Sequence, residues 1–159
     1  MEWTEANANN PGSKTIMMYV QDIMSKEVLS MSEDESIAKA RTIMGVARIR
    51  HVPVVDKEDG FVGLITHRDI LAVTVSRLAG ISAEMQADLD EGIKARDIMN
   101  CDACTVAPDT GLKDAAQILL RHKYGCLPVL DGRRLVGMLT EADFLRLTIH
   151  LLDAVDEAL

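Results

Sequence analysis

The stretch HVPVVDKEDGFVGLITHRDI, residues 51–70, decides the fold because a close copy, CLPVLDGRRLVGMLTEADF, follows at residues 126–144. Each copy contains two apolar, β-branched segments around a short polar turn, followed by a Thr that can begin a helix. Asp22-Ile23-Met24 likewise recurs as Asp97-Ile98-Met99. Matching segments lie 75 residues apart before the turn and 74 after it. The chain therefore contains two copies of one unit.

Outside the hairpins, periodicity predicts that each unit reads strand, helix, strand, strand, helix. In the first unit we expect these elements at Val28–Met31, Ser36–Arg48, Val52–Asp56, Phe61–Thr66 and onward from Thr66. In the second we expect them at Ala103–Val106, Leu112–Lys123, Leu127–Asp131, Leu135–Thr140 and onward from Thr140. This is an α/β (α+β) fold with two small three-stranded sheets, each with two helices. Because such a sheet leaves one apolar face uncovered, the units should pack together with pseudo-twofold symmetry.

The repeat also sets the expected domain organisation. We expect a polar N-terminal tail at 1–18, a first repeat at 19–78, a helical linker at 79–93, a second repeat at 94–155 and a C-terminal tail at 156–159. Apolar residues at helical spacing predict that the first unit's last helix continues or is followed by another: Leu71, Leu78, Ile81, Met85 and Leu89. Gly80 and Gly92 are the expected breaks.

The closing segment places a stripe of apolar residues on one helix face: Phe144, Leu147, Leu151 and Val155. This stripe is more apolar than a surface helix requires. It either packs within the same chain or forms a dimer face shared with the helix after Asp69.

Composition disfavours several classes of partner. The chain has 25 acidic and 17 basic residues, a formal net charge of −8, and only 3% aromatic residues. Binding to nucleic acids or anionic membranes needs clustered Lys and Arg, and base stacking needs aromatic side chains. No run of apolar residues is long enough for a membrane helix, and the polar start with Glu2 and Glu5 does not resemble a signal peptide. We therefore expect a cytoplasmic protein without nucleic-acid or membrane partners.

Cys101-x-x-Cys104 raises a different hypothesis, a redox switch or a zinc site that Cys126 or His122 could complete. The alternative is that these thiols are small apolar packing residues. Three cysteines, an odd number, do not indicate a disulfide framework. None of the Walker, H-E-x-x-H or G-x-S-x-G motifs of enzymes occurs, so we expect no catalysis.

Three motifs occur twice in the same order: Asp-Ile-Met, an apolar-Pro-Val strand, and Gly-x-x-Thr-x-x-Asp. In this set the chain resembles a free-standing pair of cystathionine β-synthase (CBS) domains, or Bateman module, over about residues 19–155. The resemblance implies a disc-like dimer with clefts between repeats that bind AMP, ADP, ATP or S-adenosylmethionine. It also implies regulation without catalysis and without an obligatory cofactor.

The resemblance assigns binding roles to the repeated Thr and Asp, with the Asp gripping ribose hydroxyls and the Thr beside a phosphate or ribose. A carboxylate can accept from two vicinal hydroxyls, and a Thr at a helix start lies beside free N–H groups. The same pattern also fits a capping box that needs no ligand. The ligand-binding residues that we expect are Ser30, Arg50, His51, Pro53, Thr66, Arg68, Asp69, Thr105, Cys126, Pro128, Thr140 and Asp143.

The two expected clefts differ in charge. Arg50-His51 precedes the first Pro-Val strand, where the second copy has Gly125-Cys126, and Arg68 follows the first Thr, where the second copy has Glu141-Ala142. A phosphate-bearing ligand should therefore depend on the first copy, unless its Arg residues are only solvated surface charges.

Together these patterns predict a ligand-sensing module that dimerises through the helices after Thr66 and Thr140 and regulates an effector protein in trans. A purely structural dimerisation module is the alternative.

Overall fold

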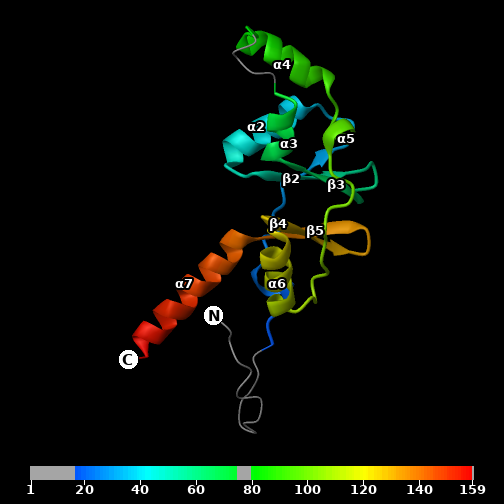
Figure 1. The fold of residues 1–159 in the computed structure, drawn as a ribbon. Coiled ribbons are helices and arrows are strands. Elements are labelled where there is room, and N and C mark those ends of the chain that lie inside the picture. The colour runs from blue at the N-terminus through cyan, green and yellow to red at the C-terminus, as the bar shows by residue number, and fades with distance from the viewer. Residues whose placement is uncertain (1–16, 75–79, 159) are drawn as a thin grey trace.

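Two sheets stack on each other at the centre of the molecule, with helices on their outer sides (Figure 1). The computed structural model describes residues 17–74 and 80–158. The first sheet has the order β1 (Met31–Ser32), β2 (His51–Val55), β3 (Phe61–Thr66), and its helices are α2 (Ile37–Ala47) and α3 (His67–Ala72). The second has β4 (Cys126–Asp131) and β5 (Arg134–Thr140), with α6 (Leu112–His122) and α7 (Glu141–Glu157). Three further helices are α1 (Val20–Ile23), α4 (Ala83–Gly92) and α5 (Ala95–Ile98).

Each repeat has its own apolar core, and a third cluster joins the two sheets. Val52, Val54 and Ile65 are fully buried in the first repeat, and Leu127 and Leu139 in the second. The joining cluster is formed by Leu64, Cys126 and Met138. The two units therefore bury the apolar faces of their sheets against each other, as predicted from the sequence.

The first strand of each unit is shorter than predicted. In the first repeat it lies at Met31–Ser32, not at Val28–Met31, and in the second it is a single parallel bridge from Val106 to Val129. The Glu33 N–H extends the first ladder by donating to the Val55 carbonyl at 3.1 Å. The equivalent residue in the second repeat is Pro108, which has no N–H to donate. The second sheet is therefore two-stranded, with one bridge where a third strand was expected.

The segment between the repeats forms a separate helix. Helix α3 ends at Ala72 and α4 begins after Ser82, whose hydroxyl accepts from the Met85 N–H at 3.2 Å. Gly80 has a φ of 76°, a conformation that glycine adopts without strain. Leu78, part of the predicted apolar spacing, lies outside the described residues.

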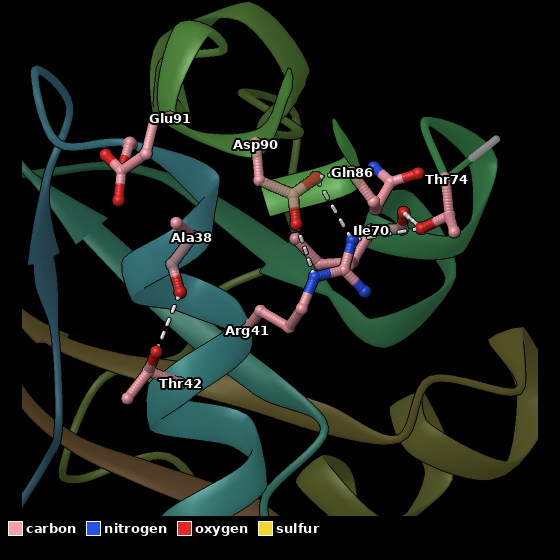
Figure 2. A network of polar contacts seen from close by, with 9 residues as sticks. Ala38, Arg41, Thr42, Ile70, Thr74, Gln86, Asp90 and Glu91 are labelled. Atoms are coloured by element: carbon pink, nitrogen blue, oxygen red, sulfur yellow. Dashed lines mark hydrogen bonds and ion pairs between the residues drawn. The ribbon is translucent and has the colours of Figure 1, made fainter. Parts of the chain in front are cut away.

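Helix α4 is held over α2 by a buried carboxylate (Figure 2). Asp90, only 2% exposed, accepts from Arg41 Nε at 2.6 Å and Nη2 at 3.2 Å, and from Gln86 Nε2 at 2.8 Å. Arg41 Nη2 also donates to Thr74 Oγ1 at 3.0 Å. The two-pronged Arg–Asp contact fixes the linker helix against the first repeat.

The segment that opens the first repeat packs on the second one. The Val20 N–H donates to the Thr110 carbonyl at 2.9 Å, and Ser25 and Met138 exchange two backbone hydrogen bonds of 2.9 Å each. Val20 is fully buried in the core of the second repeat.

The opposite exchange occurs at α5, which packs on the first repeat. The Ala95 N–H donates to the Glu35 carbonyl at 2.8 Å, and Asn100 and Leu64 exchange backbone hydrogen bonds of 2.9 and 3.0 Å. Ala95 is fully buried in the first core. Each repeat is thus completed by the short helix that precedes the other repeat in the sequence: α1 packs on the second repeat and α5 on the first.

The exchange explains the glycines of the repeated Gly-x-x-Thr motif. A Cβ added to Gly137 would lie 2.5 Å from Met24 Sδ and 3.1 Å from the Ser25 carbonyl oxygen. A Cβ added to Gly63 would lie 2.8 Å from Met99 Sδ. The Met of each Asp-Ile-Met motif therefore occupies the space that a side chain in the other repeat would need.

Gly137→Ala is expected to destabilise the protein by about 1–3 kcal/mol, the usual cost of overpacking a filled core. Urea unfolding followed by circular dichroism measures this change. Gly92→Ala is the matched control, because among the described residues a Cβ there would meet no atom within 4 Å other than those of its chain neighbours and its own helix backbone. Equal stability of the two variants would show that Met24 can move aside without cost.

Helix α7 projects away from the body of the molecule (Figure 1). Phe144 and Leu147 are partly buried, but every described residue from Thr148 onward is exposed. Of the predicted stripe, only its first half therefore packs within the chain. None of the helices in the described ranges combines the length and apolarity that crossing a membrane requires.

Candidate functional site

The first Thr-x-x-Asp motif lies at the junction of β3 and α3. The Asp69 carboxylate accepts through Oδ2 from the Thr66 N–H and from Thr66 Oγ1, both at 2.7 Å, and the Asp69 N–H donates to Thr66 Oγ1 at 3.3 Å. This is a complete capping box. Asp69 is partly exposed, and no other described residue bonds to its Oδ1. The motif thus caps a helix while one carboxylate oxygen stays open.

The second motif has the same box but a closed carboxylate. Asp143 Oδ2 accepts from the Thr140 N–H at 2.7 Å and from Thr140 Oγ1 at 2.8 Å. Its Oδ1 accepts from Arg146 Nη1 at 2.7 Å, and Asp143 is only 3% exposed. Sequence reasoning missed Arg146, although its position three residues after Asp143 on a helix is a detectable signal. The first repeat has Ala72 at the place that corresponds to Arg146.

His51 connects the two repeats. It pairs with Thr66 across β2 and β3, and its ring lies against Gly125, where an added Cβ would be 2.9 Å from both Cε1 and Nε2. Gly125 in turn accepts from the Glu141 N–H at the start of α7, at 3.4 Å. The first Thr-x-x-Asp motif is therefore linked to His51 through the strand pairing with Thr66. The second is linked to it through Gly125, which contacts the start of α7. Sequence reasoning missed the role of Gly125, which leaves room for this ring.

The pKa of His51 is lowered from its ordinary value of 6.5, chiefly by burial and then by the positive charge of Arg50. Glu141 and Asp69 oppose the shift without cancelling it. The imidazole is thus kept neutral at the junction, where it can donate and accept hydrogen bonds.

The lowered pKa predicts a pH dependence of stability. Above pH 6.5 His51 is neutral in both states, and its contribution to the unfolding free energy is complete. Below that pH the unfolded state binds a proton first, so stability falls as the pH drops toward the folded-state pKa. Urea unfolding at pH 7.5 and 5.5 should give a larger loss of stability for the wild type than for His51→Gln. Identical losses would contradict the burial of this imidazole.

The remaining basic residues lie on the outer side of this junction. Arg50 and Arg68 are exposed, and the Arg50 carbonyl accepts from the His67 N–H at 2.8 Å. Arg50 and His67 both line an open depression of about 570 Å³ on the α2 and α3 side, together with Gly45. Arg50 and Arg68 are thus exposed neighbours in the chain of His51 and Asp69, and a role of their charges beside the Asp69 carboxylate stays a prediction.

The other predicted residues fall into two groups. The Ser30 and Thr105 hydroxyls, each one residue before Met31 and Val106, are partly exposed and have no hydrogen-bond partner among the described residues. Pro53, Pro128 and Cys126 are buried within β2 and β4. These three can shape the strands beside a ligand, and a direct contact with one stays a prediction.

The cysteines do not form a ready-made metal site. Burial raises the pKa of the Cys126 thiol to about 12, so it supplies no thiolate near neutral pH. Cys101 is exposed and Cys104 is partly exposed. In the part of the chain that the structure describes, no three His, Cys, Asp or Glu side chains are grouped so that they could hold a metal ion.

Comparison with known families confirms the resemblance that the repeated motifs indicated. The CBS domain family matches residues 20–76 and 95–150, well over half of the chain. This chain belongs to the CBS domain family. The matches coincide with the two repeats, so the chain contains a CBS pair.

Relatives with CBS domains include small proteins and parts of enzymes. A CBS domain-containing protein of Dictyostelium discoideum is 31% identical over 139 residues, which cover 87% of this chain and 96% of that protein. Inosine-5'-monophosphate dehydrogenase of Methanocaldococcus jannaschii is 29% identical over 126 residues, 79% of this chain. The chain spans only 22% of that enzyme's length.

Solved structures of CBS proteins share the fold. A protein described as an acetoin utilization protein (AcuB) from Vibrio cholerae is 32% identical, with a TM-score of 0.74 over 89% of this chain and 98% of that one. CBSX2 from Arabidopsis thaliana, solved in complex with AMP, is 26% identical, with a TM-score of 0.70 over 84% and 97% of the two chains. The CBS domain pair of protein MJ0100, in complex with 5'-methylthioadenosine and S-adenosyl-L-methionine, is 28% identical, with a TM-score of 0.67 over 83% and 96%.

Proposed function

We propose that this CBS pair is a regulatory sensor that binds an adenosine-containing ligand where its repeats meet. The observation that carries the proposal is the open Oδ1 of Asp69, held beside His51 by the Thr66 capping box. A carboxylate oxygen fixed in this way can accept from the hydroxyls of a ribose. The AMP complex of CBSX2 and the S-adenosylmethionine complex of MJ0100 support this class of ligand.

The two binding positions are unequal in our proposal. The first has an open carboxylate, and the exposed Arg50 and Arg68 adjoin His51 and Asp69 in the chain, which suits a ligand that carries phosphate. In the second, Arg146 occupies the Asp143 carboxylate, and Glu141 would repel a phosphate. One chain should therefore bind one phosphate-bearing ligand tightly. A second ligand has to displace Arg146 first.

The position of His51 suggests how ligand binding could change the arrangement of the two repeats. Because its ring lies between the repeats, a ligand that orders Asp69 and the imidazole acts on both repeats at once. Ligand control requires different affinities for two arrangements of the repeats, since equal binding shifts no equilibrium. The regulated effector is a separate protein, and the sensor acts as a homodimer through the helices that begin after Thr66 and Thr140.

A thermal-shift series with AMP, ADP, ATP, S-adenosylmethionine and 5'-methylthioadenosine tests the proposal. A ligand at 100 times its dissociation constant stabilises the folded state by about 2.7 kcal/mol, which raises the melting temperature measurably. Calorimetric titration then gives the stoichiometry, with one tight site per chain expected. Arg146→Ala should strengthen binding of a second ligand and leave the first unchanged. If none of these ligands shifts the melting temperature, the Thr66 and Thr140 boxes are helix caps only, and the pair is a dimerisation module.

A further inference from the structure

We infer that Asp56 and Arg133 are positioning residues, which set the angle between the two repeats at the hairpin tips and thereby the spacing of the proposed ligand position at His51. For the ligand, this role rests on the proposed function. The angle between the repeats can be tested without any nucleotide.

The tips of the two hairpins are joined to each other. Both point to the same side of the molecule (Figure 1), and Gly60 forms an antiparallel bridge with Arg134. The Phe61 N–H donates to the Arg133 carbonyl at 2.9 Å, and Arg133 Nη2 donates to Asp56 Oδ2 at 2.8 Å. Each repeat therefore supplies one charged side chain to a contact between the tips.

Asp56 is fixed by its own turn where it receives Arg133. Its Oδ1 accepts from the N–H groups of Glu58 and Gly60, both at 2.9 Å, and its own N–H donates to the Gly60 carbonyl at 2.8 Å. The backbone hydrogen bonds from Gly60 and Glu58, and then the Arg133 cation, lower the pKa of Asp56 below its ordinary 3.8. A Cβ on Gly60 would lie 2.9 Å from Asp56 Oδ2 and 3.2 Å from Arg133 Nη2, so glycine leaves room for the contact.

The two turns are not equivalent. The first spans residues 57–60, whereas the second spans 132–134 and is one residue shorter. Asp131, the counterpart of Asp56, is exposed, and its carboxylate has no hydrogen-bond partner among the described residues. The repeat thus provides an aspartate at both tips, but only the longer turn folds around its aspartate and holds a cation of the other repeat.

The opposite end of the sheets has a different kind of contact. There the His51 ring lies against Gly125, without a hydrogen bond or ion pair to the second repeat among the described residues. Between the two ends, Leu64, Cys126 and Met138 form apolar contacts, which are non-directional. Of the direct contacts between the two sheets, the directional ones therefore lie at the tips.

The length of the strands makes the tip contact effective at His51. Four residue steps along β2 separate Val55 from His51, about 13 Å at roughly 3.3 Å per residue. A rotation of about 6° around the tips would therefore move the His51 ring relative to Gly125 by about 1.4 Å, the radius of a water molecule. Groups of two repeats that must meet one ligand are sensitive to a displacement of this size.

NMR titration of His51 tests the angle without a ligand. Burial lowers the pKa of His51, with Arg50 acting in the same direction and Glu141 and Asp69 against it. Arg133→Ala should let the repeats separate at this end, admit water to the ring and raise the pKa of His51 toward 6.5. An unchanged titration would overturn the positioning role. His51→Gln identifies the resonance among the four histidines.

Arg134→Ala is the matched control for Arg133→Ala. Arg134 is the next residue in the chain, is exposed, and has no ion-pair partner among the described residues. Its loss removes the same charge but leaves the Asp56 contact intact, so the His51 titration should stay as in the wild type. Because Arg133 is 73% exposed, its ion pair contributes little to stability, and both variants should melt close to the wild-type temperature.

Asp56→Asn gives a second way to remove the contact. Asn keeps an oxygen that can accept from the Glu58 and Gly60 N–H groups but loses the charge that Arg133 contacts. It should shift the His51 titration as Arg133→Ala does. The double variant should shift it no further, because either change removes the same contact. Additive shifts would overturn the pairing of Asp56 with Arg133.

Calorimetric titration with AMP connects the angle to the proposed function. Arg133→Ala should bind AMP about three- to tenfold more weakly than the wild type, whereas Arg134→Ala should bind it equally well. Arg133→Lys keeps the cation and should recover most of the affinity. Wild-type affinity in Arg133→Ala would overturn the effect on the ligand position. If the wild type itself does not bind AMP, that result counts against the sensor, and the His51 titration still decides whether Asp56 and Arg133 set the angle.

Discussion

Replacing Asp69 with Asn is expected to weaken binding of the phosphate-bearing adenosine ligand by about 10- to 100-fold. The change removes the charge from the carboxylate that accepts from ribose hydroxyls in the proposed site, and hydrogen bonds to charged groups contribute about 1.5–3 kcal/mol each. Asn keeps the size of the side chain, so the core beneath α3 is not disturbed. Calorimetric titration of the ligand identified by thermal shift measures the effect.

Asp143→Asn is the matched control for this prediction. It removes the same charge from the same position of the second repeat, where Arg146 already occupies the carboxylate. We expect its effect on the tight site to be less than threefold, well below that of Asp69→Asn. Both variants weaken a capping box, which costs about 1 kcal/mol. Asp143→Asn also removes the negative charge that Arg146 contacts, so its unfolding free energy should fall further than that of Asp69→Asn. Equal losses of affinity would contradict the proposed inequality of the two sites.

Leu152→Glu is expected to convert the proposed dimer to a monomer at micromolar concentrations, a rise of about 100-fold or more in the dimer dissociation constant. Leu152 is 59% exposed on the free half of α7, so the single chain should fold normally with Glu there. In a dimer the same residue would be buried, and an unpaired carboxylate in an apolar interface costs several kcal/mol. Sedimentation velocity over a range of concentrations measures the change.

His150→Glu is the control for that experiment. It adds a carboxylate to the same helix on the face that carries Arg146 and Asp153, away from the apolar stripe. A dimer that survives this change but not Leu152→Glu depends on the apolar face and not on net charge. If both variants remain dimeric, α7 is not the dimer interface.

Much of the fold could be predicted because the sequence contains two copies of the same structural unit. The hairpins and the helices that follow Thr66 and Thr140 were predicted to within about one residue, since apolar periodicity, turn residues and caps agree there. The first strands were less predictable. Their lengths depend on whether one backbone N–H, at Glu33 or Pro108, is present to extend the ladder.

The candidate site was only partly predictable. The motif identified Thr66, Asp69, Thr140 and Asp143, and the structure places them in equivalent capping boxes. The difference between the boxes depends on Arg146, which lies outside the motif. Likewise, the position of His51 against Gly125 is a contact between repeats, and no local pattern in either segment indicates it.

The reciprocal packing of α1 and α5 has a consequence for how the chain folds. The contacts of Val20 with Thr110 and of Ser25 with Met138 join segments far apart in the sequence, so the second repeat is complete only when both ends of the chain have come together. A fragment that contains only residues 94–158 should be unable to close its core. Fragments 17–93 and 94–158, expressed together, should associate and restore it. Proteolytic loss of α1 would expose the core of the distant repeat and not that of its sequence neighbour.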